Sequence, residues 1–359
     1  MNIAVIFGGK SCEHNISIAT GVQAANALLS TGNKIICIYI TRRGVWKTGK
    51  AFFDCAAFSG DAGGRTVFFL PGDNRLHYRF SPFKTRIDCA VLCLHGRNGE
   101  DGTVQGALEL SGVPYTGSGV LGSAAGMDKQ IMKKLFRADK LPYLKSITAH
   151  SRDKTENIIK KAAFTLGYPV IVKPARAGSS IGIGVAHDEE QLQNALVAAF
   201  MWDNKVIIER AVDDFTELNC AVIGSPGNEE ASRVEKPVSY SEFLTYDEKY
   251  HGKAKSGGDR QFPADIDKEQ EEKIRALAIK VFRCVEAEGI ARIDFILDNK
   301  SGKLYVNEIN TIPGSLAMYL FPEKGRAGVI MKLVSLAVAR HKEQSALKYE
   351  YDDKLLYKG

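Results

Sequence analysis

Two short segments in the last third of the chain decide its fold: residues 291–295 (ARIDF) and residues 306–310 (VNEIN). Side chains alternate along a strand, so Glu308 and Asn310 point to the same face, and a neighbouring strand brings Asp294 alongside them. Two carboxylates and an amide oxygen form the kind of hard-oxygen site that holds magnesium against nucleotide phosphates. The alternative is a solvated strand face with an ion pair between Arg292 and a carboxylate. The presence of both segments, followed by residues 311–314 (TIPG), favours the magnesium site.

Length, charge and cysteine usage bound the class of protein. The chain has 359 residues and a formal net charge of +6, and 45% of its residues are hydrophobic, which is typical of a globular protein of two or three domains. So small a basic excess argues against binding to nucleic acid or to a membrane surface. No stretch approaches the roughly 20 apolar residues of a membrane helix, and residues 1–7 do not resemble a signal peptide. The seven cysteines are scattered and lie mostly in apolar runs, which predicts buried thiols and a cytoplasmic protein.

The first third of the chain alternates apolar runs with helical periodicity. Strands that are apolar throughout and are separated by helices indicate a parallel sheet covered on both faces. Ligands of such sheets bind beyond the carboxyl ends of the strands, which draws attention to residues 8–17 and 95–102. The expected elements are strands at residues 3–7, 35–40 and 89–94 and a helix at residues 17–29.

The pattern changes from about residue 124 onwards. A strand at residues 168–174 is followed by a loop of small residues and a second strand at 181–185, which predicts a hairpin. Residues 241–262 are the one long segment without periodicity, and such a segment is usually a lid or disordered. The other expected elements are helices at residues 129–138, 154–166, 268–288 and 328–341 and strands at residues 218–223, 291–297 and 303–309.

A second constellation is suited to phosphate. Backbone amides of the small-residue loop at 175–182, which contains Ser179 and Ser180, can fold over phosphate oxygens while Lys173 supplies positive charge. The alternative is a plain surface hairpin, and the Gly-Lys-Ser/Thr of a Walker P-loop is absent. Lys129 would be a second phosphate lysine, although a lone lysine at a helix start is more often solvated.

Three further segments complete the pattern: residues 7–17 (FGGKSCEHNIS), 94–106 (LHGRNGEDGTVQG) and 114–119 (PYTGSG). Together with the carboxylate and phosphate segments, they make the chain resemble the D-alanine–D-alanine ligase family of the ATP-grasp superfamily, in order from residue 3 to about residue 340. The resemblance implies an ATP-grasp fold, α/β and α+β, preceded by a Rossmann-like parallel α/β domain. The implied domains are residues 1–123, the central subdomain 124–213, and the C-terminal subdomain 214–359 with a lid at about 241–262.

The resemblance also implies roles for single residues at the first amino-acid site. Glu13 would bind the ammonium of the first D-alanine, supported by Ser179 and closed over by Tyr250 of the lid. His95 would lie near the carboxylate of that substrate, and Arg292 with the backbone amide of Gly314 would form the oxyanion site. The plain alternatives are a helix-capping Glu13, a surface Tyr250 and a hydrogen-bonded structural His95.

For the nucleotide, the resemblance implies ATP with two Mg²⁺ ions, or Mn²⁺ in their place. Asp294, Glu308 and Asn310 would hold the metal ions. The residues implied for ATP are Lys129, Lys173, Ser180 and Lys249 at the phosphates, the Glu209 region at the adenine and Glu217 at the ribose.

The implied reaction is ATP-dependent ligation of two D-alanines for peptidoglycan precursor synthesis. The γ-phosphoryl group is transferred to a carboxylate, and the amine of a second amino acid then attacks the acyl phosphate. Magnesium, lysines and Arg292 stabilise the negative charge of both steps, and a lid excludes water. The family also implies a homodimer with its interface in the N-terminal region.

One loop departs from the family pattern. Many members carry, after the Pro-Gly, a serine and a leucine that bind the carboxylate of the second D-alanine, but here Tyr319 and Leu320 occupy those positions. Ser315, the Tyr319 hydroxyl or a backbone amide would have to hold that carboxylate. Tyr250 argues against D-lactate as acceptor and leaves D-serine open. Two alternatives therefore stand beside D-alanine ligation: a ligase with a different acceptor, and a non-catalytic nucleotide-binding protein.

Overall fold

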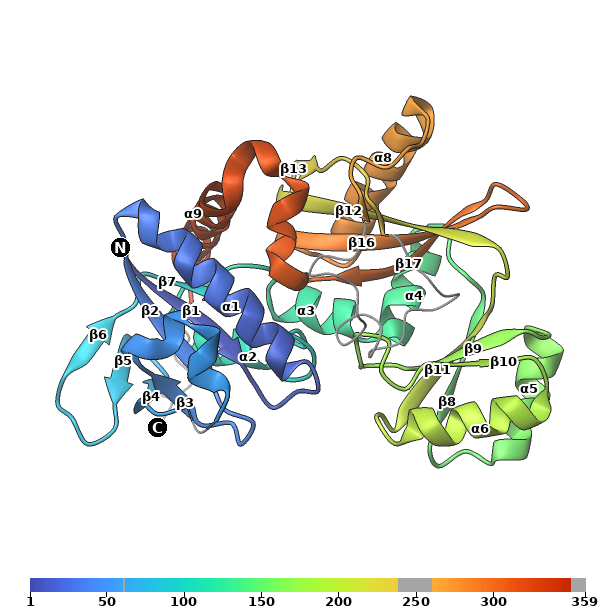
Figure 1. Ribbon diagram of the computed structural model, residues 1–359, viewed down its shortest axis with the longest axis horizontal. Helices are drawn as coiled ribbons and strands as arrows, with labels where there is room; N and C mark the ends of the chain where they lie inside the picture. Colours follow the sequence, from blue (N-terminus) through green and yellow to red (C-terminus); the bar gives the residue numbers. More distant parts are fainter. Residues whose placement is uncertain (61, 238–259, 350–359) are drawn as a thin grey trace, which may run out of the picture.

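The computed structural model describes residues 1–60, 62–237 and 260–349. Three sheets organise this part of the chain, and they follow one another along the sequence (Figure 1). Tyr250, Lys249 and most of the expected lid lie outside the described residues, so those predictions are not tested by the structure.

The first sheet has seven strands and is built around β1 (Asn2–Gly8). β1 pairs in parallel with β2 (Lys34–Ile40) on one side and with β7 (Cys89–Leu92) on the other. These are the three strands expected from their apolar runs, and α1 (His14–Leu28) follows β1 as the helical periodicity predicts. The carboxyl ends of β1 and β7 therefore bring the loops at residues 8–13 and 93–102 to one edge of the sheet.

The prediction of a parallel sheet is wrong for the remaining four strands. β3 (Trp46–Thr48), β4 (Arg65–Leu70), β5 (Asp73–Tyr78) and β6 (Lys84–Arg86) extend the sheet beyond β2 in antiparallel order. These strands are short and only partly buried, so they lack the continuous apolar runs by which the parallel strands were found. The sheet is consequently mixed.

Three helices connect the first sheet to the second. They are α2 (Thr103–Leu110), α3 (Val120–Met127) and α4 (Lys129–Ala138). The Asp128 side chain accepts hydrogen bonds from the amides of Gln130 and Ile131, which caps α4 and fixes Lys129 as its first residue.

The second sheet is antiparallel, in the order β10-β9-β11-β8. The predicted hairpin is confirmed, although its second strand begins at Gly184. Two helices pack on this sheet through a core of their own. The elements are β8 (Ser146–His150), α5 (Thr155–Thr165), β9 (Val170–Pro174), β10 (Gly184–Ala186), α6 (Glu189–Phe200) and β11 (Lys205–Arg210).

The third sheet, in the order β13-β12-β16-β17, contains the two segments ARIDF (residues 291–295) and VNEIN (residues 306–310). Its strands are β12 (Phe215–Ser225), β13 (Asn228–Ala231), β16 (Gly289–Asp298) and β17 (Leu304–Asn310). A small pair, β14 (Lys236–Pro237) with β15 (Arg260–Gln261), flanks β12. α8 (Lys268–Cys284) packs on this sheet together with α3 and α4, and it ends four residues before the expected Glu288.

The C-terminal helix α9 (Gly325–Ser345) returns to the first sheet. Its residues Val329, Leu333 and Ala337 share one hydrophobic core with β1, β7 and α1, and the turn η4 (Gly314–Leu320) joins the same core. In Figure 1 the helix accordingly lies beside the N-terminal sheet. None of the helices in the described part of the chain is both long and apolar enough to span a membrane.

The contact between α1 and β1 gives a test of the core. A Cβ atom on Gly21 would lie 2.3 Å from the ring of the buried Phe7. Gly21→Ala should therefore lower the free energy of unfolding by about 1–3 kcal/mol, the usual cost of overpacking a core. The matched control is Gly106→Ala in α2, where the nearest atom to the new Cβ is 3.9 Å away. Urea unfolding of both variants checks the prediction, which fails if Gly21→Ala is as stable as the control.

Candidate active site

The carboxylate face of β16 and β17 is the first part of the site. The antiparallel register places Asp294 directly opposite Glu308, as the strand alternation predicts. Asn310 Nδ2 donates a hydrogen bond to Asp294 Oδ2 at 3.0 Å, and Arg292 donates through Nε and Nη2 at 2.6 and 2.8 Å. The Arg292 to carboxylate ion pair is thus present, but its face is largely buried, because the two side chains are only 23% and 15% exposed.

The chemistry of this donor set fits a hard cation. Asp294 and Glu308 supply carboxylate oxygens, and Asn310 uses its amide N–H on Asp294, which leaves its amide oxygen as an acceptor. Within the described residues there is no cluster of three or more His, Cys, Asp and Glu side chains that suits a metal. The candidate ligands are the carboxylates of Asp294 and Glu308 and the amide oxygen of Asn310, and oxygen ligands of this kind are those that Mg²⁺ prefers.

Two lysines stand across from the carboxylate face, on the second sheet and on α4. Lys129 Nζ lies 3.3 Å from Glu308 Oε2 and donates to the carbonyl oxygen of Ala177 at 2.9 Å. Lys173 Nζ donates to Asn307 Oδ1 at 3.1 Å. The two predicted phosphate lysines therefore converge on β17 from elements that lie far away in the sequence.

A buried carboxylate positions Lys173 together with a further lysine, Lys133. Glu209 is 1% exposed, and its two oxygens lie 2.9 Å from the Nζ atoms of Lys173 and Lys133. Burial raises the pKa of Glu209, but the two ammonium groups outweigh it and lower that pKa to about 2. Glu209 therefore stays ionised and holds both lysines.

Lys133 is a site residue that the sequence analysis missed. Its signal was its spacing of four residues from Lys129 on α4, which places both ammonium groups on one helix face. Burial lowers the pKa of Lys133, whereas Glu209 and Glu308 hold the pKa of Lys173 above its usual value despite burial. Glu217, expected at the ribose, lies half-buried on β12.

Glu13 lies at the junction of the first and second sheets. Ser179 Oγ donates a hydrogen bond to Glu13 Oε1, so the expected partnership of these residues is present. The Glu13 side chain makes no capping hydrogen bond to α1, which excludes the helix-cap alternative. Gly96 and Gly178 pack against the carboxylate so closely that a Cβ on either would come within 3 Å of its oxygens. Ser179 and Ser180 both adopt positive φ angles, 53° and 58°, which turn the loop over Glu13.

His95 and Glu100 line the same region from the loop after β7. His95 Nε2 lies 2.9 Å from Thr20 Oγ1, and burial lowers the pKa of His95 to about 4, so its imidazole is neutral at pH 7. Glu100 accepts a hydrogen bond from the amide of Gly96 at 2.6 Å. Burial and the neighbouring Glu13 raise the pKa of Glu100 to about 8. The sequence motif at residues 94–106 contains Glu100 but does not predict a function for it. Only the packing shows that Glu100 is buried beside a second carboxylate.

The turn that begins at Gly314 connects the residue expected at the oxyanion to the expected acceptor loop. Ser315, Leu316 and Ala317 have φ angles of 50°, 50° and 45°, a left-handed turn that L residues rarely adopt. The Ser315 amide donates to Thr20 Oγ1 at 3.2 Å, while the Leu320 side chain is buried in the first core. Only the backbone of Leu320 is therefore available to a ligand.

The Tyr319 side chain is used within the protein. Its hydroxyl donates a hydrogen bond to Glu235 Oε2 at 3.0 Å, and burial raises the pKa of Tyr319 to about 12.

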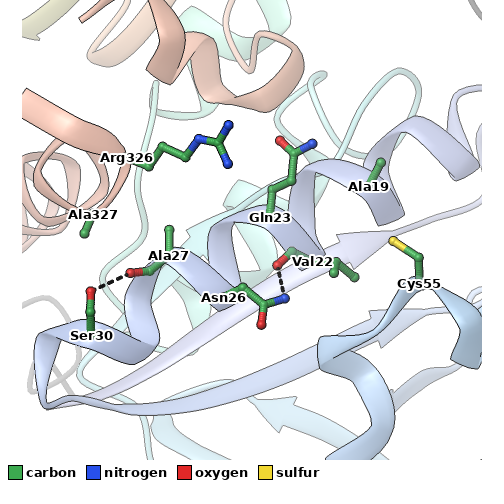
Figure 2. Close-up of a pocket in the computed structure, with 9 residues that line it drawn as sticks. All are labelled: Ala19, Val22, Gln23, Asn26, Ala27, Ser30, Cys55, Arg326 and Ala327. Carbon is green, nitrogen blue, oxygen red and sulfur yellow. Dashed lines mark hydrogen bonds between the residues drawn. The ribbon is translucent and has the colours of Figure 1, made fainter. Parts of the chain in front are cut away.

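A separate hollow of about 660 Å³ lies between α1 and the start of α9 (Figure 2). None of the predicted site residues lines this hollow, so it takes no part in the chemistry of the carboxylate face. Its lining residues are Ala19, Val22, Gln23, Asn26, Ala27, Ser30, Cys55, Arg326 and Ala327.

Glu100 gives a prediction for stability against pH. Its pKa in the folded protein, about 8, lies above its ordinary value of 4.5, so the stability it contributes is present below pH 4.5 and is lost as pH rises through 8. Glu100→Gln should raise the melting temperature relative to the parent protein by a few degrees at pH 9 and much less at pH 5. Glu190→Gln, the same exchange at an exposed helix start, is the control. A difference in Tm for Glu100→Gln that does not change with pH would contradict the assignment.

Comparisons with known proteins agree over nearly the whole chain. Residues 2–118 match the family model described as D-ala D-ala ligase N-terminus, and residues 135–335 match D-ala D-ala ligase C-terminus. A D-alanine–D-alanine ligase of Thermosipho africanus is 37% identical, with 99% of this chain and 98% of that protein covered. Among solved structures, the D-alanine–D-alanine ligase of Coxiella burnetii is 28% identical with a TM-score of 0.83 and covers 96% of both chains. The VanG D-Ala:D-Ser ligase of Enterococcus faecalis is 31% identical with a TM-score of 0.81, covering 94% of this chain and 99% of that one.

Proposed function

Because this chain belongs to the D-alanine–D-alanine ligase family and has that family's ATP-grasp fold, we infer that it is an ADP-forming ligase of D-alanine. It joins two D-alanines to D-alanyl-D-alanine, which serves peptidoglycan synthesis. The observation that supports the proposal most strongly is that Lys129 and Lys173 contact β17 beside the carboxylate face of β16 and β17. The same chain matches both the N-terminal and the C-terminal family models.

In the first step, the γ-phosphoryl group of ATP is transferred to the carboxylate of the first D-alanine. Lys129 and Lys173 bind the phosphates, and Glu209 keeps Lys173 charged and in place. Glu13 binds the ammonium of the substrate, and neutral His95 lies near its carboxylate without adding charge. Asp294, Glu308 and Asn310 would hold two Mg²⁺ ions, which supply electrostatic stabilisation of the charge on the transferring group.

In the second step, the amine of the second amino acid attacks the acyl phosphate, and phosphate leaves. Arg292 and the Gly314 amide stabilise the developing oxyanion; Asp294 aligns Arg292 through two hydrogen bonds and raises its pKa against the effect of burial. Tyr250 and Lys249, in the lid at 241–262, are assigned to closing over Glu13 and to approaching the γ-phosphate. Exclusion of water by the lid would protect the acyl phosphate.

We assign the remaining nucleotide contacts to the same side of the site. Ser180 offers its loop amide to phosphate, the Glu209 region contacts the adenine and Glu217 binds the ribose. The proposed domains are residues 1–123, 124–213 and 214–359.

The proposed assembly is a cytoplasmic homodimer whose interface lies in the N-terminal region. Four buried cysteines, Cys37, Cys89, Cys93 and Cys220, suit a reducing compartment. Light scattering of the purified chain tests the oligomeric state.

A second candidate function differs only in the acceptor. The similarity to a D-Ala:D-Ser ligase and the replacement of the usual acceptor serine by Tyr319 both favour testing D-serine. The deciding experiment measures phosphate release with Mg-ATP and D-alanine alone, then with D-serine or D-lactate added, and identifies the products by mass. D-alanyl-D-alanine is the expected product. Turnover that requires another second amino acid would favour the alternative acceptor, and absence of stimulation by any D-amino acid would favour a non-catalytic nucleotide-binding protein.

Glu308→Gln tests the metal site. The exchange removes a charge from the carboxylate face without changing side-chain volume, so magnesium-dependent turnover should fall by roughly 100-fold or more while the fold is retained. Steady-state kinetics across a magnesium titration measure the effect. Glu230→Gln on β13, at a glutamate paired with Lys324, is the control and should leave turnover unchanged. Near-normal activity of Glu308→Gln at ordinary magnesium would refute the assignment.

Tyr319→Ser tests the acceptor loop. The exchange removes the hydrogen bond to Glu235 and opens the space of a phenol ring, so the KM of the second amino acid should change much more than the KM of ATP. Initial-rate measurements with each substrate varied in turn decide the point. If both constants stay at their parent values, the acceptor does not bind at this loop.

A further inference from the structure

Glu235 is a buried carboxylate that the reaction scheme leaves without a role. It is 2% exposed, and backbone hydrogen bonds of 2.8 Å in both directions fix it to Asn219 of β12. Its side chain accepts the Tyr319 hydroxyl proton, and Arg260 Nε lies 3.6 Å from its second oxygen. A buried charge is tolerated only when it is paired, so Glu235 organises both neighbours.

Tyr319 cannot replace the serine of the family pattern. A phenol has one proton to donate, and Tyr319 donates it to Glu235. The hydroxyl therefore has no donor left for a substrate carboxylate. Leu320 has only backbone atoms to offer, and the Ser315 amide is used by Thr20. Residues 314–320 contain no cationic side chain, so a nearby guanidinium would give the carboxylate of the second amino acid a charged partner that this loop lacks.

The Arg260 guanidinium is a cation beside Tyr319 that could bind this carboxylate. Its guanidinium carbon lies 4.2 Å from the centroid of the Tyr319 ring, and its side chain is 44% exposed. The pairing of β15 with β14 places Arg260 opposite Pro237, two residues after Glu235 in the chain. Among the described residues, only Glu235 forms an ion pair with Arg260, and it does so through Nε. The two terminal nitrogens can therefore form the planar fork that binds a carboxylate.

The cluster adjoins the reacting centre. Two backbone hydrogen bonds join Glu235 to Asn219 of β12, and Asn219 lies directly opposite Asp294 of β16, the hydrogen-bond partner of the proposed oxyanion residue Arg292. A second amino acid whose carboxylate binds Arg260 would therefore lie beside the strand that carries Arg292. Glu235 compensates the charge of the two arginines, which keeps the Arg260 fork aligned with the ring.

We propose that Arg260 binds the α-carboxylate of the second amino acid, with Tyr319 as its stacking surface and Glu235 as its positioning residue. The inference rests on the proposed ligase function. It limits the acceptors to amines that carry a free carboxylate, such as D-alanine or D-serine. The amide of the same amino acid, which keeps the amine but lacks the negative charge, is a poor acceptor.

The test compares Arg260→Met with the parent enzyme, using D-alanine and D-alaninamide as competing acceptors. The KM of the second amino acid should rise by about 10- to 100-fold, the range expected for loss of a charge-assisted hydrogen bond, while the KM of ATP stays within about twofold. The preference for D-alanine over D-alaninamide should fall by a similar factor. Arg260→Lys should restore part of the preference, because it keeps the charge and loses the fork.

Two controls separate this proposal from other effects. Arg233→Met removes an arginine of similar exposure that pairs with Glu271, and it should leave both constants unchanged. Tyr319→Phe keeps the stacking surface and removes the hydrogen bond to Glu235, so it should weaken acceptor binding less than Arg260→Met does. Melting temperatures of all variants check that each variant retains its fold. An unchanged acceptor KM and an unchanged preference in Arg260→Met would overturn the proposal.

A partial reaction distinguishes failure of this inference from failure of the proposed function. Hydroxylamine attacks an acyl phosphate at the carbonyl and releases phosphate, so D-alanine, Mg-ATP and hydroxylamine yield D-alanine hydroxamate without any acceptor carboxylate. With D-alanine held well below its KM as acceptor, so that dipeptide formation does not compete, the parent enzyme and Arg260→Met should form hydroxamate at equal rates. Absence of hydroxamate with the parent enzyme would reject the ligase function itself. A parallel loss of hydroxamate and dipeptide in Arg260→Met would place Arg260 in the first step and overturn the acceptor assignment.

Discussion

The buried ion cluster of Glu209 with Lys133 and Lys173 is the interaction on which the geometry of this site depends. An uncompensated charge in the interior costs several kcal/mol, so the three side chains are obliged to stay together. They come from α4, β9 and β11, and their pairing joins the helix to the second sheet. With Lys173 fixed in this way, its contact with Asn307 also links the second sheet to β17. Lys173 is thereby held beside the carboxylate face, and the ion pair of Lys129 with Glu308 holds the second predicted phosphate lysine there.

A second constraint operates where the first sheet meets the loop at 175–182. Glu13 is confined between Gly96 and Gly178, and Glu100 is buried close by. Burial and, after it, the neighbouring Glu13 raise the pKa of Glu100 to about 8, so Glu100 retains its proton near neutral pH, while Glu13 accepts a hydrogen bond from Ser179. The neutral imidazole of His95 adds no positive charge beside the Glu13 carboxylate, which suits this region to an ammonium group.

At the acceptor loop, this chain has kept the fold of its family and changed the local chemistry. The left-handed turn at Ser315, Leu316 and Ala317 directs Leu320 into the core and Tyr319 towards Glu235. The hydroxyl of Tyr319 is thus used within the protein rather than on a ligand. The neighbouring guanidinium of Arg260 gives the loop a cation in place of a neutral donor, and this difference separates recognition of the second substrate from recognition of the first.

The sequence by itself determined the family, the three parallel strands of the first sheet, the strand face with Asp294, Glu308 and Asn310, and the two lysines that lie against β17. These features depend on local periodicity and on short motifs, which are readable without long-range contacts. It did not reveal the antiparallel strands between residues 46 and 86, since their half-exposed pattern is weak. Only the tertiary structure decided the roles of Lys133, Glu100, Glu235 and Arg260. Their importance arises from burial beside charges that lie far away in the chain, and a pKa or an ion pair exists only once folding has brought those charges together.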